Sequence, residues 1–252
     1  MIVEGPRGEA STTAKRRKRM VYLSPKTIIV DFLRKNVTDP RTRISSTSDT
    51  FTATAAQTSF SLSPTAGKTL SHIISATIAG VASVKWKDYY IDFKNEKVIF
   101  FTGVTSGDTV VITYGEGTTN WIYPDKPNEK LSATAFPRMN ILIIGNPGVR
   151  LGNYEAPVEA IPRIQIDIWA KEKQDDQIFT IGSSKYTGED LTEYLSYKIT
   201  EAFEDNEEEL FPALYGYDPV GMPPDLPFDD ELQCHHKIVE VVLRGVSIGR
   251  IN

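Results

Sequence analysis

Residues 161–169 read IPRIQIDIW, and this stretch decides what kind of core the chain can build. Isoleucine alternates there with polar or aromatic residues: Ile164, Ile166 and Ile168 against Arg163, Gln165, Asp167 and Trp169. Because successive side chains of a strand point to opposite faces, the pattern predicts a β-strand with one buried face and one face in water.

The segments around this strand extend it into a small sheet with a helix. Residues 136–144 (FPRMNILII) and 236–246 (HKIVEVVLRGV) are expected to form two further strands. Thr187 and Asp190 resemble a capping box, and apolar residues recur behind them at helical spacing. These are Leu191, Tyr194, Leu195, Ile199, Ala202 and Phe203.

A second helix is predicted near the start of the chain, over residues 24–36. Ser24 is a suitable N-cap, and Pro25 fits the first helical position because that position needs no N–H donor. Ile28, Ile29, Phe32 and Leu33 fall on one face, which we expect to pack against the rest of the body.

Residues 50–117 differ in character from the segments on either side. Short runs rich in β-branched and aromatic residues alternate with Gly, Ser, Pro and Asn turns, which predicts an antiparallel, sandwich-like β module. The chain therefore divides into an α/β body of residues 21–49 and 118–252, an inserted module of residues 50–117, and an N-terminal arm of residues 1–20.

The charge of the chain is unevenly distributed. Residues 1–19 hold six basic and two acidic residues, a net charge of +4, so the other residues carry −9 of the total of −5. The arm lacks apolar periodicity, so we expect it to be flexible. Its basic run could bind nucleic acid or a protein partner, act as a targeting signal, or be a solvated tail without a specific role. The run comprises Lys15, Arg16, Arg17, Lys18 and Arg19.

An acidic stretch lies at the opposite end of the body. Residues 199–236 contain eleven acidic residues and no Lys or Arg. The segment 204–231 is also too apolar for a random linker, which favours a loop that docks on a surface. Asp229, Asp230 and Glu231 are its candidate contact residues.

The sequence offers little for catalysis or cofactor binding. Cys234, His235 and His236 are adjacent, so a strand would turn them to opposite faces and away from one ion. Paired carboxylates such as Asp175 and Asp176 lie in polar runs, so we expect them to form a solvated acidic surface rather than a catalytic acid and base. Neither phosphate-binding glycine pattern nor a nucleophile elbow is present. We therefore predict no enzyme activity, no metal, no cofactor and no membrane segment, in a chain whose single cysteine suits a reducing compartment.

The order of these segments resembles the tail terminator, or tail completion, proteins of tailed bacteriophages. The resemblance rests on an early helix ending near TDPRTRI (38–44), on AFPRMNILII and IPRIQIDIWA, on the helix LTEYLSYKITEAF, and on the closing strand. Residues 50–116 also look like a recurring phage structural element, in which DYYIDFKNEKVIFF is followed by TSGDTVVITYGEG. The positions that carry that second similarity are Asp88, Tyr89, Tyr90, Asp92, Ile99, Phe101, Gly107, Asp108, Val110 and Tyr114.

The resemblance implies an α+β fold: a small mixed or antiparallel sheet with two helices on one face, plus the inserted all-β module. It also implies a structural virion protein of the phage neck, made in the host cytoplasm. Such a protein assembles as a homo-oligomer, a hexameric ring that caps the tail tube and joins it to the head connector. Arg163, Gln165 and Asp167 would then face the lumen or neighbouring subunits, and the basic arm could contact packaged DNA.

Three other functions stay open at this point. The chain could be a head completion or connector adaptor protein, which also forms a ring without an active site. It could instead be a nucleic-acid-binding regulator that uses the basic arm, although its acidic body would repel DNA. An adhesin that binds carbohydrate through the module is weaker still, because Trp86, Tyr89 and Tyr90 are expected to fill the module's core.

Overall fold

Most of the described chain is β-structure. The structure is a computed structural model that describes residues 24–124, 135–145, 148–150, 158–160, 162–172, 178–211, 216–220, 226, 228–229 and 233–244. Strands make up 51% of the described structure and helices 20%. The predicted α+β class is therefore wrong, and the fold is mainly β. The difference arises partly because segments that lack a clear alternating pattern, such as 179–186 and 216–220, form short paired strands.

The elements follow one another from helix α1 to strand β16. In chain order they are α1 (Pro25–Asn36), β1 (Ile44–Thr52), β2 (Gln57–Ser61), β3 (Thr69–Ile78), β4 (Val81–Ser83), β5 (Tyr89–Asp92), β6 (Lys97–Val104), β7 (Thr109–Gly117), β8 (Ile122–Tyr123), β9 (Arg138–Gly145), β10 (Gly148–Arg150), β11 (Val158–Ala160), β12 (Arg163–Lys171), β13 (Phe179–Ile181), β14 (Ser184–Tyr186), α2 (Gly188–Asp205), the 3-10 helix η3 (Glu207–Glu209), β15 (Gly216–Val220) and β16 (Cys234–Arg244).

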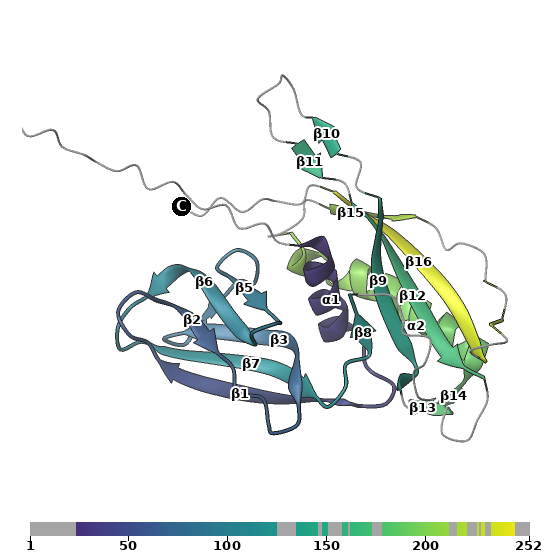
Figure 1. Ribbon diagram of the computed structural model, residues 1–252, viewed down its shortest axis with the longest axis horizontal. Helices are drawn as coiled ribbons and strands as arrows, with labels where there is room; N and C mark the ends of the chain where they lie inside the picture. Colours follow the sequence, from purple (N-terminus) through teal and green to yellow (C-terminus); the bar gives the residue numbers. More distant parts are fainter. Residues whose placement is uncertain are drawn as a thin grey trace, which may run out of the picture.

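Strands β1 to β7 form a two-layered sandwich, seen on the left of Figure 1. One layer is a four-stranded sheet in the order β1-β7-β3-β4, and the other is β2-β6-β5. Alternation on β7 buries Val110, Ile112 and Tyr114, as the sequence pattern predicts. The rings of Phe51 and Phe60 meet across the two layers with centroids 5.4 Å apart.

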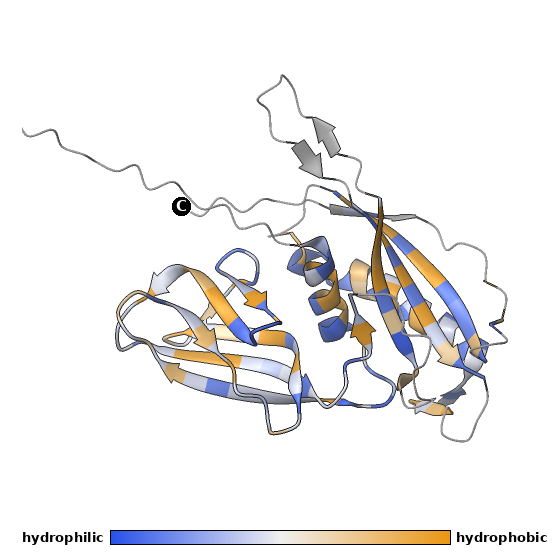
Figure 2. Cartoon of the chain, viewed as in Figure 1, coloured by the Kyte–Doolittle hydropathy of each residue, from blue (hydrophilic) through white to orange (hydrophobic). Residues whose placement is uncertain are grey.

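The large sheet on the right of Figure 1 runs in the order β15-β16-β12-β9-β8. All its neighbours are antiparallel except β8 and β9. Helices α1 and α2 cover one face of it, because alternate residues of β9, β12 and β16 are apolar (Figure 2). Ile164, Ile166 and Ile168 of β12 are fully buried on that face, as their spacing predicts.

Helix α1 lies between the sandwich and the large sheet (Figure 1). It begins at Pro25, as predicted, although the side chain of the N-cap residue Ser24 makes no capping hydrogen bond, and it buries Ile28, Ile29 and Leu33 completely. Buried apolar side chains form one continuous cluster from the sandwich through α1 to the large sheet. The helix therefore belongs to the cores of both parts.

Helix α2 confirms the predicted helix but not its capping box. Thr187 is the N-cap residue in extended conformation, yet its side chain makes no capping hydrogen bond and its Oγ1 is buried without a partner among the described residues. Leu191, Leu195 and Ile199 are buried, which is what their spacing predicts.

Candidate functional site

The residues that the sequence singles out for contacts lie in several places. Lys15, Arg16, Arg17, Lys18 and Arg19 fall outside the described residues, as do Asp230 and Glu231. Asp229 is half-buried, and its backbone exchanges two hydrogen bonds with Cys234 at the start of β16. Earlier in the same acidic segment, β15 pairs with β16, so this part of the segment completes the sheet of its own chain.

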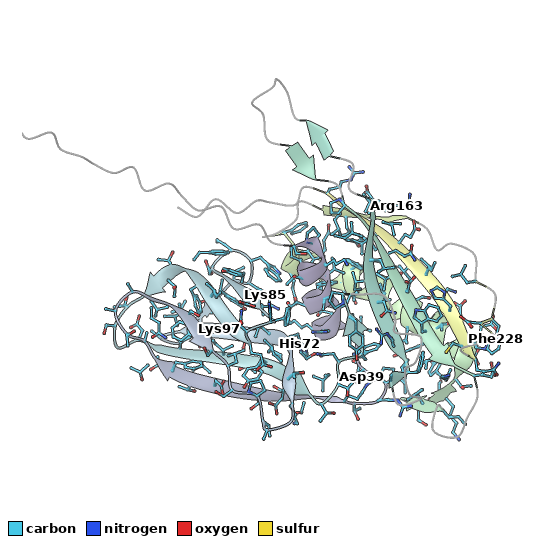
Figure 3. The ribbon with its side chains drawn as sticks, viewed as in Figure 1. Asp39, His72, Lys85, Lys97, Arg163 and Phe228 are labelled. Carbon is cyan, nitrogen blue, oxygen red and sulfur yellow. The ribbon has the colours of Figure 1, made fainter. Side chains whose placement is uncertain are left out.

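Arg163, which Figure 3 labels, shares with Gln165 and Asp167 the face of β12 that is turned away from the helices. Arg163 pairs with Glu240 of the adjacent strand β16, its Nε donating over 2.9 Å. Gln165 donates from Nε2 to Asp167 over 2.7 Å. Asp167 was expected in water, but it is only 4% exposed because neighbouring strands and side chains cover it.

Asp167 is the centre of a polar network that the sequence pattern does not reveal. His236 on β16 lies 3.2 Å from it through Nε2, and its ring stacks on Trp169 with centroids 3.8 Å apart. The pairing register brings these residues together, because Trp169 lies opposite His236 on one side and opposite Arg138 on the other. The sequence would reveal this network only if the two alternating strands β12 and β16 were placed side by side in the correct register.

The same face continues onto β9 with two buried polar residues. Arg138 donates from Nε to the Asn140 side chain over 2.8 Å, and its guanidinium lies over the ring of Tyr123 at 4.2 Å. Burial lowers the pKa of Arg138, while Tyr123 opposes that effect. Asn140 Nδ2 and Trp169 Nε1 are buried without hydrogen-bond partners among the described residues. Such unsatisfied donors are costly, so this face is not optimised for stability alone.

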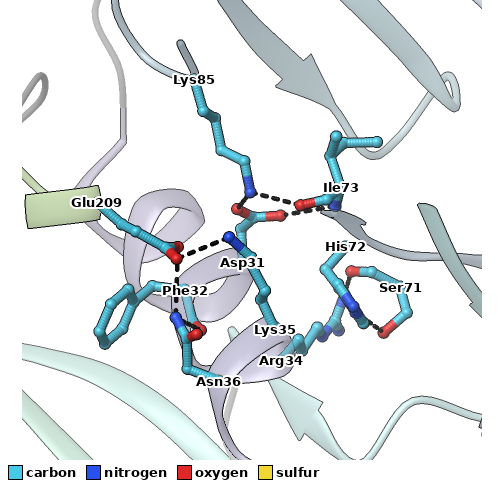
Figure 4. Close-up of polar contacts among 10 residues, drawn as sticks. All are labelled: Asp31, Phe32, Arg34, Lys35, Asn36, Ser71, His72, Ile73, Lys85 and Glu209. Atoms are coloured by element: carbon cyan, nitrogen blue, oxygen red, sulfur yellow. Dashed lines mark hydrogen bonds and ion pairs between the residues drawn. The ribbon is translucent and has the colours of Figure 1, made fainter. Parts of the chain in front are cut away.

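A second polar cluster joins α1 to the sandwich (Figure 4). Asp31 is 1% exposed, and its carboxylate accepts from Lys85 Nζ at 2.5 Å and from the backbone N–H of Ile73 at 3.1 Å. Lys85 also donates to the Ile73 carbonyl. Because each buried charge finds a partner on the other element, the cluster fixes the sandwich against the helix. We call Asp31, Arg34, His72, Ile73 and Lys85 the α1 seam.

Arg34 links the α1 seam to both parts of the molecule. It donates to the carbonyl of Ile122 in the large sheet, over 2.9 Å from Nε, and to that of Ser71 in the sandwich over 2.9 Å. Burial lowers its pKa to about 10, with Asp31 opposing the shift, so the group stays protonated at neutral pH. Burial likewise lowers the pKa of His72 to about 4, which keeps this imidazole neutral.

The segment 38–44, quoted above as TDPRTRI, forms the link from α1 to the first strand of the sandwich. The Asp39 carboxylate accepts from the backbone N–H of Arg41 and of Arg43, each at 3.0 Å, and from the Arg43 guanidinium at 2.7 Å. Arg41 and Arg43 then donate to the carbonyls of Phe136 and Pro137 just before β9. The link is therefore tied to the large sheet as well.

Two cavities flank α1 where it meets the sandwich. One of about 430 Å³ is lined by Val30, Arg34, Trp86, Tyr90 and Phe93, among others. Another has a volume of about 340 Å³. It is lined in part by Phe32, Trp86, Val84 and Glu208. Trp86 is buried between the two cavities, so it offers no open aromatic platform of the kind a carbohydrate would stack on.

The chemistry available in the described residues is that of packing and hydrogen bonding. No three His, Cys, Asp or Glu side chains of the described ranges come together as a cation site. Cys234 is buried, and burial raises the pKa of its thiol to about 11, so it is protonated and a poor nucleophile. His235 pairs with Glu172 whereas His236 pairs with Asp167, so the two imidazoles diverge.

The comparisons with known proteins add no family to these observations. No protein-family model matches the chain, and a search of curated proteins finds no match either. Neither helix in the described part of the chain is long and apolar enough to cross a membrane.

Proposed function

We propose that this chain is a structural protein of a phage neck, which assembles as a six-membered ring, caps the tail tube and joins it to the head connector. The resemblance of its segment order to tail terminator proteins supplies the identity of the partners. The α1 seam is the observation that supports an adaptor role most directly.

An adaptor needs two surfaces held at a fixed angle, and the α1 seam provides such a connection. Buried polar contacts of Asp31 and Arg34 tie the sandwich to α1, and α1 shares the core of the large sheet. A flexible tether would leave the two parts free to turn, whereas buried, paired charges select one arrangement. Geometry of this kind can decide where a polymer stops and what joins its end.

Electron microscopy tests the proposal in two steps. Negatively stained, purified full-length chain is expected to show rings of six subunits. Antibodies raised against the chain are expected to label intact phage particles at the junction of head and tail. Rings that label the head side alone would favour the connector adaptor. Label on the capsid surface or the tail tip, or no label on particles, would contradict both neck roles.

A further inference from the structure

The edge strands of the described sheets differ in how well they are protected. An unprotected edge exposes backbone donors and acceptors that another strand can pair with, and proteins usually block it with a short strand, a bulge or proline. Strands β4, β5 and β8 are short, β2 has an irregular register, and β15 contains Pro219. Strand β1 has none of these protections, because its nine residues (ISSTSDTFT) pair with β7 in an unbroken register.

The backbone of β1 offers a regular row of groups at its open edge. Ala53 follows β1 and donates its N–H to Asp108 directly opposite. Since hydrogen-bonded pairs alternate in an antiparallel ladder, Asp49 and Phe51 point their N–H and C=O groups at β7. Ser48 and Thr50 point theirs away from the sheet, and both side chains are exposed. Within the described residues β1 has β7 as its single neighbour (Figure 1).

The opposite edge of the same sheet has an apolar side chain that is exposed to solvent. Strand β4 ends the order β1-β7-β3-β4, and its Val81 is 71% exposed, the highest value among the large apolar residues of the described chain. Ala79 and Gly80 form the two-residue turn before it, at φ 49° and 80°, and Ile78 lies opposite Val81. In such a hairpin Ile78 and Val81 form a hydrogen-bonded pair, so Ala82 points its backbone groups outward.

We propose that β1 of one subunit pairs with β4 of a second copy of this chain, so that the four-stranded sheet continues from subunit to subunit. Successive strands of the sheet are antiparallel, so a copy placed edge to edge presents β4 antiparallel to β1. Pairing Thr50 with Ala82 matches outward-pointing backbone groups on both strands. The same register sets exposed Val81 beside half-buried Phe51, which covers the valine.

This contact is heterologous, since two different edges meet. Heterologous contacts close into rings when the rotation between copies fits, and otherwise propagate as open filaments. The inference rests on the proposed ring and names one of the surfaces that would build it.

Cysteine cross-linking tests the contact directly. The double variant T50C/A82C places a thiol on each strand, and an opposed pair of strands brings Cα atoms about 5.5 Å apart, within the range that a disulfide spans. The only native cysteine, Cys234, is buried. After oxidation by diamide, we expect a ladder of covalent oligomers on a non-reducing gel. T50C alone, A82C alone and T102C/A82C are the controls, because Thr102 is an exposed residue of β6, the central strand of the other sheet.

A charge at the edge gives the second test. Thr50→Lys puts an ammonium group at the open edge of β1, and we expect the solution mass to fall at least twofold. Thr113→Lys is the matched control, because Thr113 is a half-buried residue of the inner strand β7 that already lies opposite Ser48 of β1 and Ser75 of β3. Its mass should equal that of the unmodified chain.

The outcomes separate this contact from the proposed function. A ladder restricted to T50C/A82C, together with a mass lost in Thr50→Lys, supports the edge pairing. An unmodified chain that forms rings while T50C/A82C gives no ladder overturns the edge pairing and leaves the ring intact. An unmodified chain that stays monomeric at every concentration rejects the ring and the contact together.

Discussion

His72 is a buried residue whose protonation is opposed by its surroundings. Its imidazole is buried beside Gly115 in the sandwich, and burial lowers its pKa from 6.5 to about 4. Lys85, Arg34 and Lys35 add to that effect, while Asp31 opposes it. The unfolded chain therefore binds a proton at this site between pH 6.5 and 4 that the folded chain does not bind.

Stability should consequently rise with pH in that window. The contribution of His72 is fully present above pH 6.5 and is lost as the pH falls toward 4, a change on the order of 3 kcal/mol. Urea unfolding at pH 7 and pH 5 should show about 2 kcal/mol of this change, because about 1.5 pH units of the window lie between those two values. His72→Gln, which cannot be protonated, should show a smaller loss between the two pH values. Equal losses in both proteins would show that His72 is not the group responsible.

Gly115 is required next to His72 for a steric reason. A Cβ atom at this position would lie 2.4 Å from His72 Cε1, closer than any ordinary contact. We expect Gly115→Ala to destabilise the fold by about 1–3 kcal/mol, as measured by urea unfolding. The cost should shrink when His72 is replaced by Ser, because the smaller side chain removes the clash. An unchanged cost in the His72→Ser background would place the strain elsewhere.

At the scale of elements, the α1 seam contains the ion pair that should matter most. Asp31→Asn leaves Lys85 buried without its counter-charge, and we expect a loss of about 3–5 kcal/mol in the free energy of unfolding. Glu209→Gln is a suitable control, because Glu209 and its partner Lys35 are both partly exposed and such pairs contribute about 1 kcal/mol or less. Similar losses in the two variants would mean that the seam does not hold the parts together.

The elements predictable from the sequence are those with a regular pattern. The helix after Ser24, the helix after Thr187 and the isoleucine-rich strand at 164–168 follow from periodicity, which depends only on neighbours along the chain. The predicted fold class, α+β, was wrong because the fold is mainly β. Short strands such as β13 and β15 lack a long alternating pattern, and they form because a partner strand supplies hydrogen bonds.

The contacts that define the candidate surfaces were beyond the sequence pattern. Asp31 and Lys85 are 54 positions apart, and nothing local distinguishes either from a solvated charge. Asp167 was expected in water because its strand alternates. Its burial depends on His236, which the register of the sheet brings beside it, and on Gln165, which lies two residues earlier on the same strand. Pairing between distant segments, rather than local preference, decides both cases.

At the scale of the whole molecule, one continuous core joins the sandwich, helix α1 and the large sheet. Polar faces and open edges remain on the outside of this body, including β1 and β4 at the two ends of one sheet. A subunit built in this way has a fixed shape with different surfaces on different sides. That is the property on which the proposed neck role depends, since a ring that caps a tube must present a different face to each neighbour.

The solution mass of the purified full-length chain tests this account most directly. Light scattering coupled to size-exclusion chromatography, over a hundredfold range of concentration, should give six times the chain mass of 28.1 kDa. Addition of salt should leave the ring largely intact, because edge pairing and apolar contact are less screened than surface charge. A mass equal to a single chain throughout that range would contradict the proposed ring.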